Sequence, residues 1–170
     1  WILMVISTAT VLSLLGLSET FQTVKFRQGT RLMVAGEYLS AAEQFERTRP
    51  FFSRNLLVDQ ASTYHSLFEA DGNSLWLEKA SGALSVHLNN NPHDARAYGL
   101  LAQIERKRGD RDAAERALLK GLEVDPINHF SLYRALVELY RDQGKSDDLQ
   151  HWAQKIKPLI EAYLGKLRVN

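Results

Sequence analysis

Apolar residues between positions 95 and 126 recur every three or four residues, in two runs separated by a glycine. This spacing places side chains on one face of an α-helix, so each run predicts a helix with one apolar face. The apolar positions are Tyr98, Leu101 and Ala102 in the first run, and Ala114, Leu118 and Leu122 in the second. Gly109-Asp110 separates the runs, and Asp125-Pro126 ends the second. The segment therefore predicts a helical hairpin.

The same pattern recurs along the chain at an interval of about 34 residues. Pro92 and Pro126, which each end a unit, are thirty-four residues apart. Comparable copies cover residues 22–50, 55–92 and 130–157. The copy at 55–92 diverges most, because its first helix is shortened before Asp71-Gly72. The interval predicts a run of similar hairpins rather than one closed bundle.

Glycine turns and prolines place the ends of the expected helices. We expect helices over residues 22–34, 38–49, 55–69, 74–88, 95–108, 111–124, 130–142 and 146–157. Asp94 and Asn128 are expected to cap the helices that follow them. The C-terminal stretch KPLIEAYLGKLRVN carries an apolar stripe. It predicts a helix that continues the last hairpin or covers the end of the stack.

Small and large side chains occupy matching positions in the copies. Small residues such as Gly29 and Ala102 allow two antiparallel helices to approach closely, while large ones such as Tyr98 and Leu118 fill the gaps. One hairpin cannot bury its apolar face alone, so neighbouring hairpins must stack. Burial of each large side chain contributes about 1.5–3 kcal/mol, which exceeds any difference in helix propensity.

These features resemble the tetratricopeptide repeat, a two-helix unit with a period of about 34 residues. The resemblance covers residues 22–157 and is clearest for residues 95–126. It implies an all-α fold, a solenoid of about four helical hairpins, with the first helix of each hairpin lining a concave groove. We therefore expect a repeat domain over residues 21–170 that includes a C-terminal capping helix.

Residues 1–20, WILMVISTATVLSLLGLSET, carry no charge before Glu19. A helix from Trp1 to Leu17 would be about 26 Å long, slightly shorter than the bilayer core. No basic residue precedes this run and no small-residue cleavage site follows it, which disfavours a secretory signal peptide. We predict an apolar transmembrane helix that precedes the repeats, in a chain cut from a longer one because it begins with Trp. A buried core helix and an uncleaved leader are the alternatives.

Charge and cysteine content narrow the classes of partner and of chemistry. The chain has 21 basic and 20 acidic residues and a formal charge of +1, which argues against a nucleic-acid binder. It has no cysteine, which excludes disulfides and cysteine-ligated zinc. Neither observation selects a cellular compartment.

The sequence contains no recognisable catalytic or metal-binding motif. The histidines are His65, His87, His93, His129 and His151, and they form no HExxH pair, so we expect them to be solvent-exposed. Gly109-Asp110 and Gly36-Glu37 lack the glycine density and the lysine of a phosphate-binding loop. We therefore predict no enzymatic activity, cofactor or metal for these residues. The aromatic residues at repeat spacing, Trp76, Tyr98, Tyr133, Tyr140 and Trp152, are expected to be packing residues.

The resemblance also implies which residues face the groove, namely the non-core positions of each first helix. These are Arg96, Gln103, Arg106 and Lys107, then Arg134, Glu138, Arg141 and Asp142, and in the divergent copy Ser62, His65 and Glu69. The set is mixed but leans basic, which suits an acidic or polar peptide. We do not predict a C-terminal carboxylate as ligand, because Gln103 and Ala135 stand where that subgroup needs Asn. Alternatively, these charges only form local ion pairs on a solvated surface.

Three functional hypotheses follow. The first is a membrane-tethered interaction and scaffolding module that binds a partner polypeptide in its groove, at the bacterial inner membrane with the repeats in the periplasm. The second is the non-catalytic extracytoplasmic tail of a membrane enzyme that polymerises or ligates polysaccharide, because the order of segments is similar to that of the O-antigen ligase and polymerase family. The third is a soluble repeat protein whose first helix packs on the solenoid. None of them requires nucleic acid as a partner.

Overall fold

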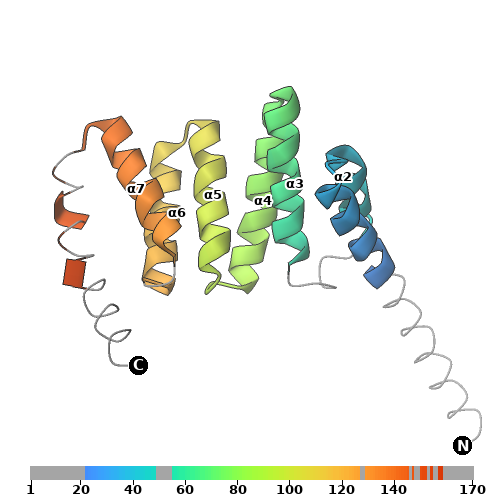
Figure 1. Ribbon diagram of the computed structural model, residues 1–170, viewed down its shortest axis with the longest axis horizontal. Helices are drawn as coiled ribbons and strands as arrows, with labels where there is room; N and C mark the ends of the chain where they lie inside the picture. Colours follow the sequence, from blue (N-terminus) through green and yellow to red (C-terminus); the bar gives the residue numbers. More distant parts are fainter. Residues whose placement is uncertain are drawn as a thin grey trace, which may run out of the picture. The chain divides into compact units, whose positions relative to one another are not determined.

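Helices are the only regular elements in the part of the chain that the computed structural model describes, which is residues 22–48, 55–126 and 129–145 and part of 147–158. The chain divides into two compact units, residues 1–83 and 84–170. Within each unit, neighbouring helices pack against one another (Figure 1). The prediction of an all-α fold built from helical hairpins is confirmed.

The first unit begins with a helix over residues 22–34, which pairs with α2. Its further helices are α2 (Tyr38–Glu46), α3 (Leu56–Asp71) and the start of α4 (Ser74–Asn90). The first two helices approach closely because Gly29 has no side chain: a Cβ there would lie 2.6 Å from Cε1 of Phe45. The Phe45 ring is fully buried and lies 6.0 Å from the ring of Phe26. Gly29 therefore has the packing role that the sequence predicts.

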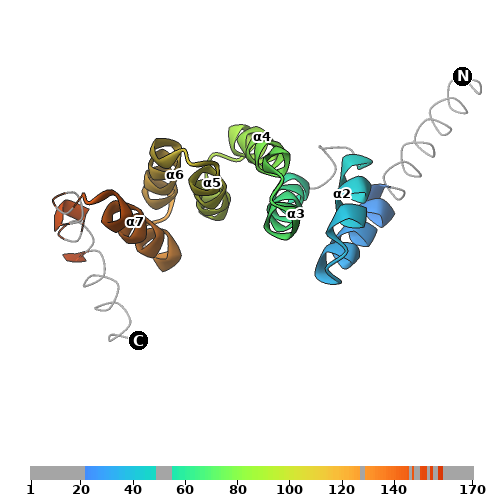
Figure 2. The same ribbon diagram turned by 90° about the horizontal axis from the view of Figure 1, so that it is seen from above.

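The second unit contains the end of α4 and the helices that resemble the repeat most clearly. They are α5 (Ala95–Arg108), α6 (Arg111–Val124) and α7 (Phe130–Gln143). Helix α6 packs against both α5 and α7, and Figure 2 shows the three helices side by side. Their shared core contains Ala102, Ala114, Leu118, Leu136 and Tyr140, all at most 3% exposed. Alanines and large side chains thus alternate at the interface, as predicted.

Glycines and aspartates mark the helix ends. Gly72, Gly109 and Gly144 each follow a helix with a positive φ of between 68° and 85°, a conformation that side chains disfavour. The Asp94 carboxylate accepts a hydrogen bond from the backbone N–H of Ala97 and caps α5, as predicted. Asp110 caps α6 in the same way. The turn chemistry read from the sequence therefore positions these helix ends.

In each unit, a helix carboxylate pairs with a tyrosine and a lysine from later in the chain. In the first unit, Glu46 Oε1 accepts hydrogen bonds from the Tyr64 hydroxyl at 2.8 Å and from Lys79 Nζ at 2.9 Å. In the second, Glu115 accepts from the Tyr140 hydroxyl at 2.9 Å and from Lys145 Nζ at 2.8 Å.

The lysine of each of these clusters also lies over an aromatic ring. Nζ of Lys79 is 5.5 Å from the ring centroid of Tyr64, and Nζ of Lys145 is 5.5 Å from that of Tyr140. Each cluster thus links a second helix of one hairpin to the next hairpin, which the sequence did not reveal.

Several predicted boundaries need correction. Helix α2 ends at Glu46 rather than at residue 49, and α3 and α4 each extend two residues beyond the prediction. Helix α3 is not shortened: it has 16 residues and ends where Gly72 adopts a positive φ. Asn128 lies outside the described residues, and the N-cap position of α7 is His129, without a side-chain cap.

The predicted apolar helix over residues 1–20 and the apolar stripe of the C-terminal stretch lie outside the described residues. Among the helices that the structure does describe, none combines the length and the apolar character that crossing a bilayer requires.

Candidate functional site: a groove between α5 and α7

A small open hollow lies between α5 and α7 in the second unit. Its volume is about 210 Å³, and it is lined by Arg96, Gly99, Leu100, Gln103, His129, Ser131, Leu132 and Ala135. Pockets that bury a drug-sized ligand are larger, roughly 300–1,000 Å³. The hollow therefore suits a side chain of a bound polypeptide better than a small molecule enclosed by the protein.

Leu132, which lines the hollow, packs closely against a glycine of α5 and a glycine of α6. Gly99 and Gly121 both face Leu132: a Cβ on Gly99 would lie 2.7 Å from Leu132 Cδ2, and one on Gly121 would lie 2.8 Å from Leu132 Cδ1. Leu132 is thus held between two glycines of neighbouring helices and is only 4% exposed. It forms part of the hollow's lining.

Tyr133 fixes the start of α7 next to the hollow. Its hydroxyl donates a hydrogen bond of 2.8 Å to the backbone oxygen of Pro126, at the end of α6. Burial raises the pKa of Tyr133, and the nearby Asp125 carboxylate adds to the shift. The hydroxyl therefore stays protonated and remains a donor near neutral pH. This contact holds the end of α6 and the start of α7 together.

The structure brings five of the residues predicted for the groove to one face of α5 and α7, namely Arg96, Gln103, Arg106, Arg134 and Glu138. Arg96 and Gln103 line the hollow. One helical turn further along, Arg106 Nη1 lies 3.5 Å from Glu138 Oε2, and Arg134 Nε lies 3.9 Å from Glu138 Oε1. The Arg106–Glu138 contact joins α5 to α7 beside the hollow, and the Arg134–Glu138 contact lies within α7.

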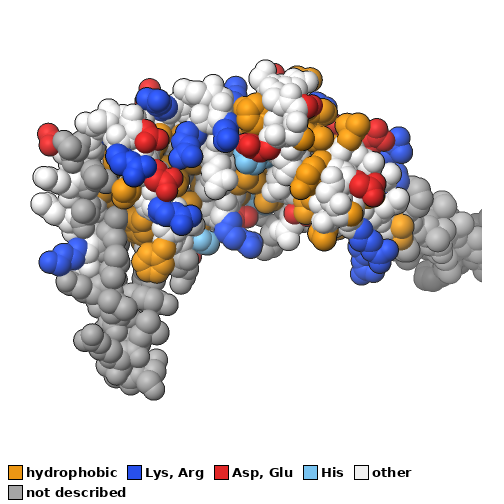
Figure 3. Space-filling model, turned by 45° about the horizontal axis from the view of Figure 1, so that its top comes forward, with side chains coloured by type: hydrophobic (Ala, Val, Ile, Leu, Met, Phe, Trp, Pro, Cys, Tyr) orange, Lys and Arg blue, Asp and Glu red, His pale blue; other side chains and the backbone are white. Residues whose placement is uncertain are grey.

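The remaining predicted residues of this unit lie on the exposed surface near the ends of α5 and α7. Lys107 is exposed, and Arg141 is 74% exposed with its Nε 3.9 Å from Asp142 Oδ1. Arg134 is 79% exposed. On the face that Figure 3 shows, basic side chains are interspersed with acidic and apolar ones.

The residues predicted from the divergent copy belong to the first unit. Ser62, His65 and Glu69 lie along α3, where His65 Nε2 is 3.6 Å from Glu69 Oε1. They are partly buried or exposed, and they lie in a different unit from the hollow. No shared site with the second unit is inferred from them.

Sequence reasoning missed most of the uncharged lining of the hollow. Gly99 and Leu100 lie between Arg96 and Gln103 on the same helix, and Ser131 follows Arg96 by thirty-five residues. The helical spacing and the repeat interval could therefore have identified them. The residues predicted for the groove are all polar or charged, whereas the lining also includes apolar and small residues.

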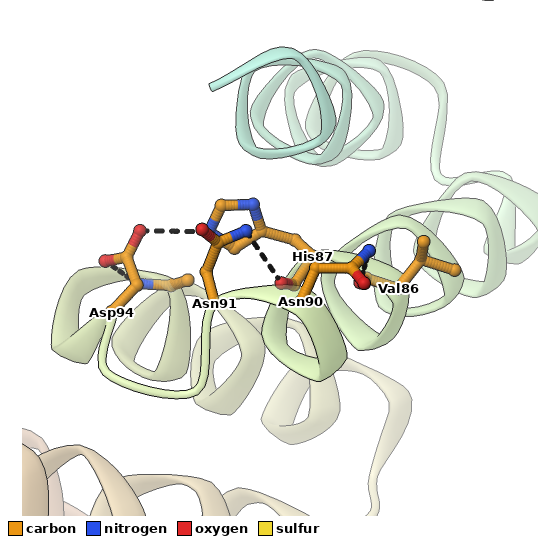
Figure 4. A network of polar contacts seen from close by, with 6 residues as sticks. Val86, His87, Asn90, Asn91 and Asp94 are labelled. Carbon is orange, nitrogen blue, oxygen red and sulfur yellow. Dashed lines mark hydrogen bonds and ion pairs between the residues drawn. The ribbon is translucent and has the colours of Figure 1, made fainter. Parts of the chain in front are cut away.

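The expectation that the histidines are solvent-exposed is wrong for His87. Its side chain is only 1% exposed, and Nε2 lies 3.0 Å from Asp94 Oδ2 (Figure 4). A buried imidazole requires such a polar partner, and the aspartate that caps α5 supplies it. His129 also deviates, because it is partly buried beside the hollow with Nε2 3.4 Å from Asp125 Oδ2. Among the residues that the structure describes, no three acidic or histidine side chains cluster as a metal site.

Tyr133 and Tyr140 are buried, and Trp152 packs against the core of the second unit. Trp76 stacks on Tyr64 with ring centroids 5.9 Å apart. Tyr98 is partly buried, and its Cβ would lie 3.1 Å from a Cβ on Gly121. These aromatic residues therefore pack within the helical units, as predicted.

No protein-family model matches the chain. Solved structures do match it. The crystal structure of MamA superposes with a TM-score of 0.69 and 20% identity, over 86% of this chain and 81% of MamA. The first TPR (tetratricopeptide repeat) domain of Spaghetti (RPAP3), bound to the HSP90 peptide SRMEEVD, gives a TM-score of 0.63 at 17% identity, over 72% of this chain and 93% of that one.

The Sgt2 TPR domain from Aspergillus fumigatus gives a TM-score of 0.61 at 19% identity, over 75% of this chain and 82% of that domain. The chain has the tetratricopeptide-repeat fold. The resemblance drawn from the repeat interval is thereby confirmed, and at these identities the likeness establishes the fold alone. In a TPR solenoid the hollow between α5 and α7 lies between the first helices of two successive hairpins, α5–α6 and the hairpin that α7 opens.

Proposed function

We propose that this chain is a protein-interaction module that binds an acidic or polar polypeptide segment along α5 and α7. The observation that carries the proposal is the hollow lined by Arg96 and Gln103, with Arg106 and Arg134 one turn away. Its open form and small volume fit an extended chain that inserts one side chain. A protein with the same fold, the first TPR of RPAP3, is bound to a peptide with acidic residues, SRMEEVD.

Charge supports the choice of an acidic ligand. Guanidinium groups form charge-assisted hydrogen bonds with carboxylates, and those of Arg134 and Arg141 are 79% and 74% exposed. The backbone of a bound segment would contribute no net charge, so acidic side chains would determine its preference for this surface. A solvated surface with local ion pairs, the alternative from the sequence, predicts no such preference.

A binding measurement with charge-reversed variants tests the proposal. The probe is a fluorescein-labelled octapeptide of alternating glutamate and leucine, followed by fluorescence anisotropy. We expect the double variant Arg106→Glu/Arg141→Glu to bind about tenfold more weakly or worse, because two attractions become repulsions. Arg111→Glu/Arg116→Glu is the matched control with the same change in net charge, since both residues are exposed on α6, which does not line the hollow.

Equal binding by the wild type, the double variant and the control would contradict the groove assignment. Far-ultraviolet circular dichroism must show unchanged helix content for each variant, so that a loss of binding is not a loss of fold. A peptide of alternating glutamine and leucine should bind more weakly than the acidic probe to the wild type, because it offers no carboxylate to the arginines.

We also propose that residues 1–20 anchor the module at a membrane, with the repeats on the periplasmic side of a bacterial inner membrane. The support is the length and apolar character of WILMVISTATVLSLLGL. We expect the full chain to float with phospholipid vesicles, and a chain that lacks residues 1–20 not to float with them. Equal recovery of both chains in the soluble fraction would contradict the anchor.

The alternative of a non-catalytic tail on a membrane polysaccharide polymerase or ligase depends on the same apolar segment. It differs in predicting further apolar helices upstream of Trp1 in the natural reading frame. Sequencing that upstream region separates the two hypotheses.

A further inference from the structure

Among the positions predicted for the groove on α5 and α7, Glu138 is an acidic residue that contacts two of the arginines. It bridges Arg106 of α5 and Arg134 of α7, at 3.5 Å and 3.9 Å. It lies one turn after Ala135, and Arg106 lies one turn after Gln103, so the ion pair continues directly from the lining of the hollow. A ligand carboxylate that approached these arginines would meet the Glu138 carboxylate on the same groups.

The contacts that hold Glu138 are long and accessible to water. Both distances exceed the 2.7–2.9 Å of strong charge-assisted hydrogen bonds. The side chains of Arg106 and Glu138 are 44% and 39% exposed, and that of Arg134 is 79% exposed. Solvent-exposed pairs of this kind contribute little to stability. By contrast, Glu115 lies 2.8 Å from Lys145 and is only 20% exposed. Glu138 can therefore leave its arginines at little cost, whereas Glu115 holds a tight contact.

We propose that Glu138 competes with the acidic ligand for two arginines. In the free protein its carboxylate pairs with Arg106 and Arg134, and a ligand carboxylate displaces it when the ligand binds. This inference rests on the proposed function. The residue sets the specificity of the groove, because a ligand must supply enough negative charge to replace the internal carboxylate. A weakly acidic or neutral segment leaves Glu138 in place and gains nothing from the two arginines.

The neighbouring lining defines the rest of the ligand. Leu100, Leu132 and Ala135 give the hollow an apolar part, and it lies within one turn of the arginine pair. The surface thus fits a polypeptide with an apolar side chain next to one or more carboxylates. Residues of opposite character, a lysine beside an apolar side chain, would leave Arg106 and Arg134 facing a like charge.

The test replaces the carboxylate by an amide of the same shape. Glu138→Gln is expected to bind the glutamate–leucine octapeptide about threefold to tenfold more tightly than the wild type, because one repulsive charge is removed and two guanidinium groups are released. The gain should shrink at high salt, since screening weakens interactions between exposed charges. The glutamine–leucine octapeptide should bind both proteins equally.

Glu123→Gln is the matched control. Glu123 is also exposed and ion-paired, with Lys120 Nζ at 2.8 Å, but it lies on α6 away from the hollow. The same change in net charge there should leave the affinity unchanged, which separates a local effect from a general electrostatic one. An equal gain in both variants would overturn the proposal.

Two further outcomes overturn it while leaving the proposed function intact. If Glu138→Gln binds the acidic peptide no better than the wild type, yet Arg106→Glu/Arg141→Glu loses binding, Glu138 does not compete. If Glu138→Gln binds more weakly, Glu138 positions Arg106 for the ligand instead. If charge reversal of the arginines has no effect either, the proposed function fails first, and this inference fails with it.

Discussion

Replacing Asp94 should destabilise the protein more than replacing the equivalent cap of the next helix. Both Asp94 and Asp110 accept a hydrogen bond from the backbone N–H three residues later, at 3.1 Å and 2.8 Å. Asp94 differs because its second oxygen lies 3.0 Å from Nε2 of His87, whose side chain is 1% exposed (Figure 4). Among the described residues, Nδ1 of His87 has no hydrogen-bond partner, whereas Nε2 of the same buried ring contacts Asp94.

The difference between the two variants can be estimated from these contacts. Loss of an N-cap costs about 1 kcal/mol in either helix. Asp94→Ala also leaves a buried imidazole nitrogen without a partner, which costs about 1–3 kcal/mol more. We therefore expect Asp94→Ala to lower the free energy of unfolding by about 2–4 kcal/mol and Asp110→Ala by about 1 kcal/mol.

Urea denaturation followed by circular dichroism at 222 nm gives the free energy of unfolding for both variants. The pH dependence supplies a second readout. Burial alone would raise the pKa of Asp94, but hydrogen bonds from His87 and from the backbone N–H of Ala97 lower it below its usual value. The Asp94 carboxylate therefore stabilises the folded protein at pH values above about 3.8, its pKa in the unfolded chain. This stabilisation is lost as the pH falls through the lower pKa that Asp94 has in the folded protein. Equal destabilisation by Asp94→Ala and Asp110→Ala at neutral pH would refute the role assigned to the His87 contact.

Two further pairs of variants test the packing and the inter-hairpin cluster. Gly121→Ala should be about 1–3 kcal/mol less stable than Gly82→Ala in urea denaturation. Both variants gain helix propensity, but the new Cβ at position 121 would lie 2.8 Å from Leu132 Cδ1, whereas the one at position 82 would contact nothing within 4 Å. Equal stability of the two variants would contradict the close packing. Hydrogen bonds from Lys79 and Tyr64 lower the pKa of Glu46, so its contribution to stability is present above about pH 4.5 and is lost as the pH falls through the lower folded pKa. Glu46→Gln should therefore flatten the stability profile below pH 4.5 in thermal melts, whereas Glu43→Gln, a 58% exposed residue of the same helix, should leave the profile unchanged.

The sequence by itself determined the helices and their order. Apolar spacing defines the helical faces, and glycine and aspartate define most of the turns, because both effects act within a few residues. For this reason α5 and α6 begin and end where the sequence predicts. The ends of α2 and α3 deviate by a few residues because tertiary packing also contributes to helix ends.

The sequence also indicated two of the residues that line the hollow between α5 and α7. Arg96 and Gln103 line the hollow because the repeat interval fixes which face of each first helix is not buried. It could not show the apolar part of the lining, since Leu100 and Leu132 look like ordinary core residues in the sequence. Their role depends on the small volumes of Gly99 and Gly121 on neighbouring helices.

Only the tertiary structure decided which polar residues meet. Glu46 and Lys79 are thirty-three residues apart, and Glu115 and Lys145 are thirty apart. The buried His87 contacts Asp94, which caps the next helix, and Glu138 contacts Arg106 because α5 and α7 are neighbours. Local spacing determines a helix, but a contact between helices depends on their packing distance and rotation, which arise only when all hairpins bury their apolar faces together.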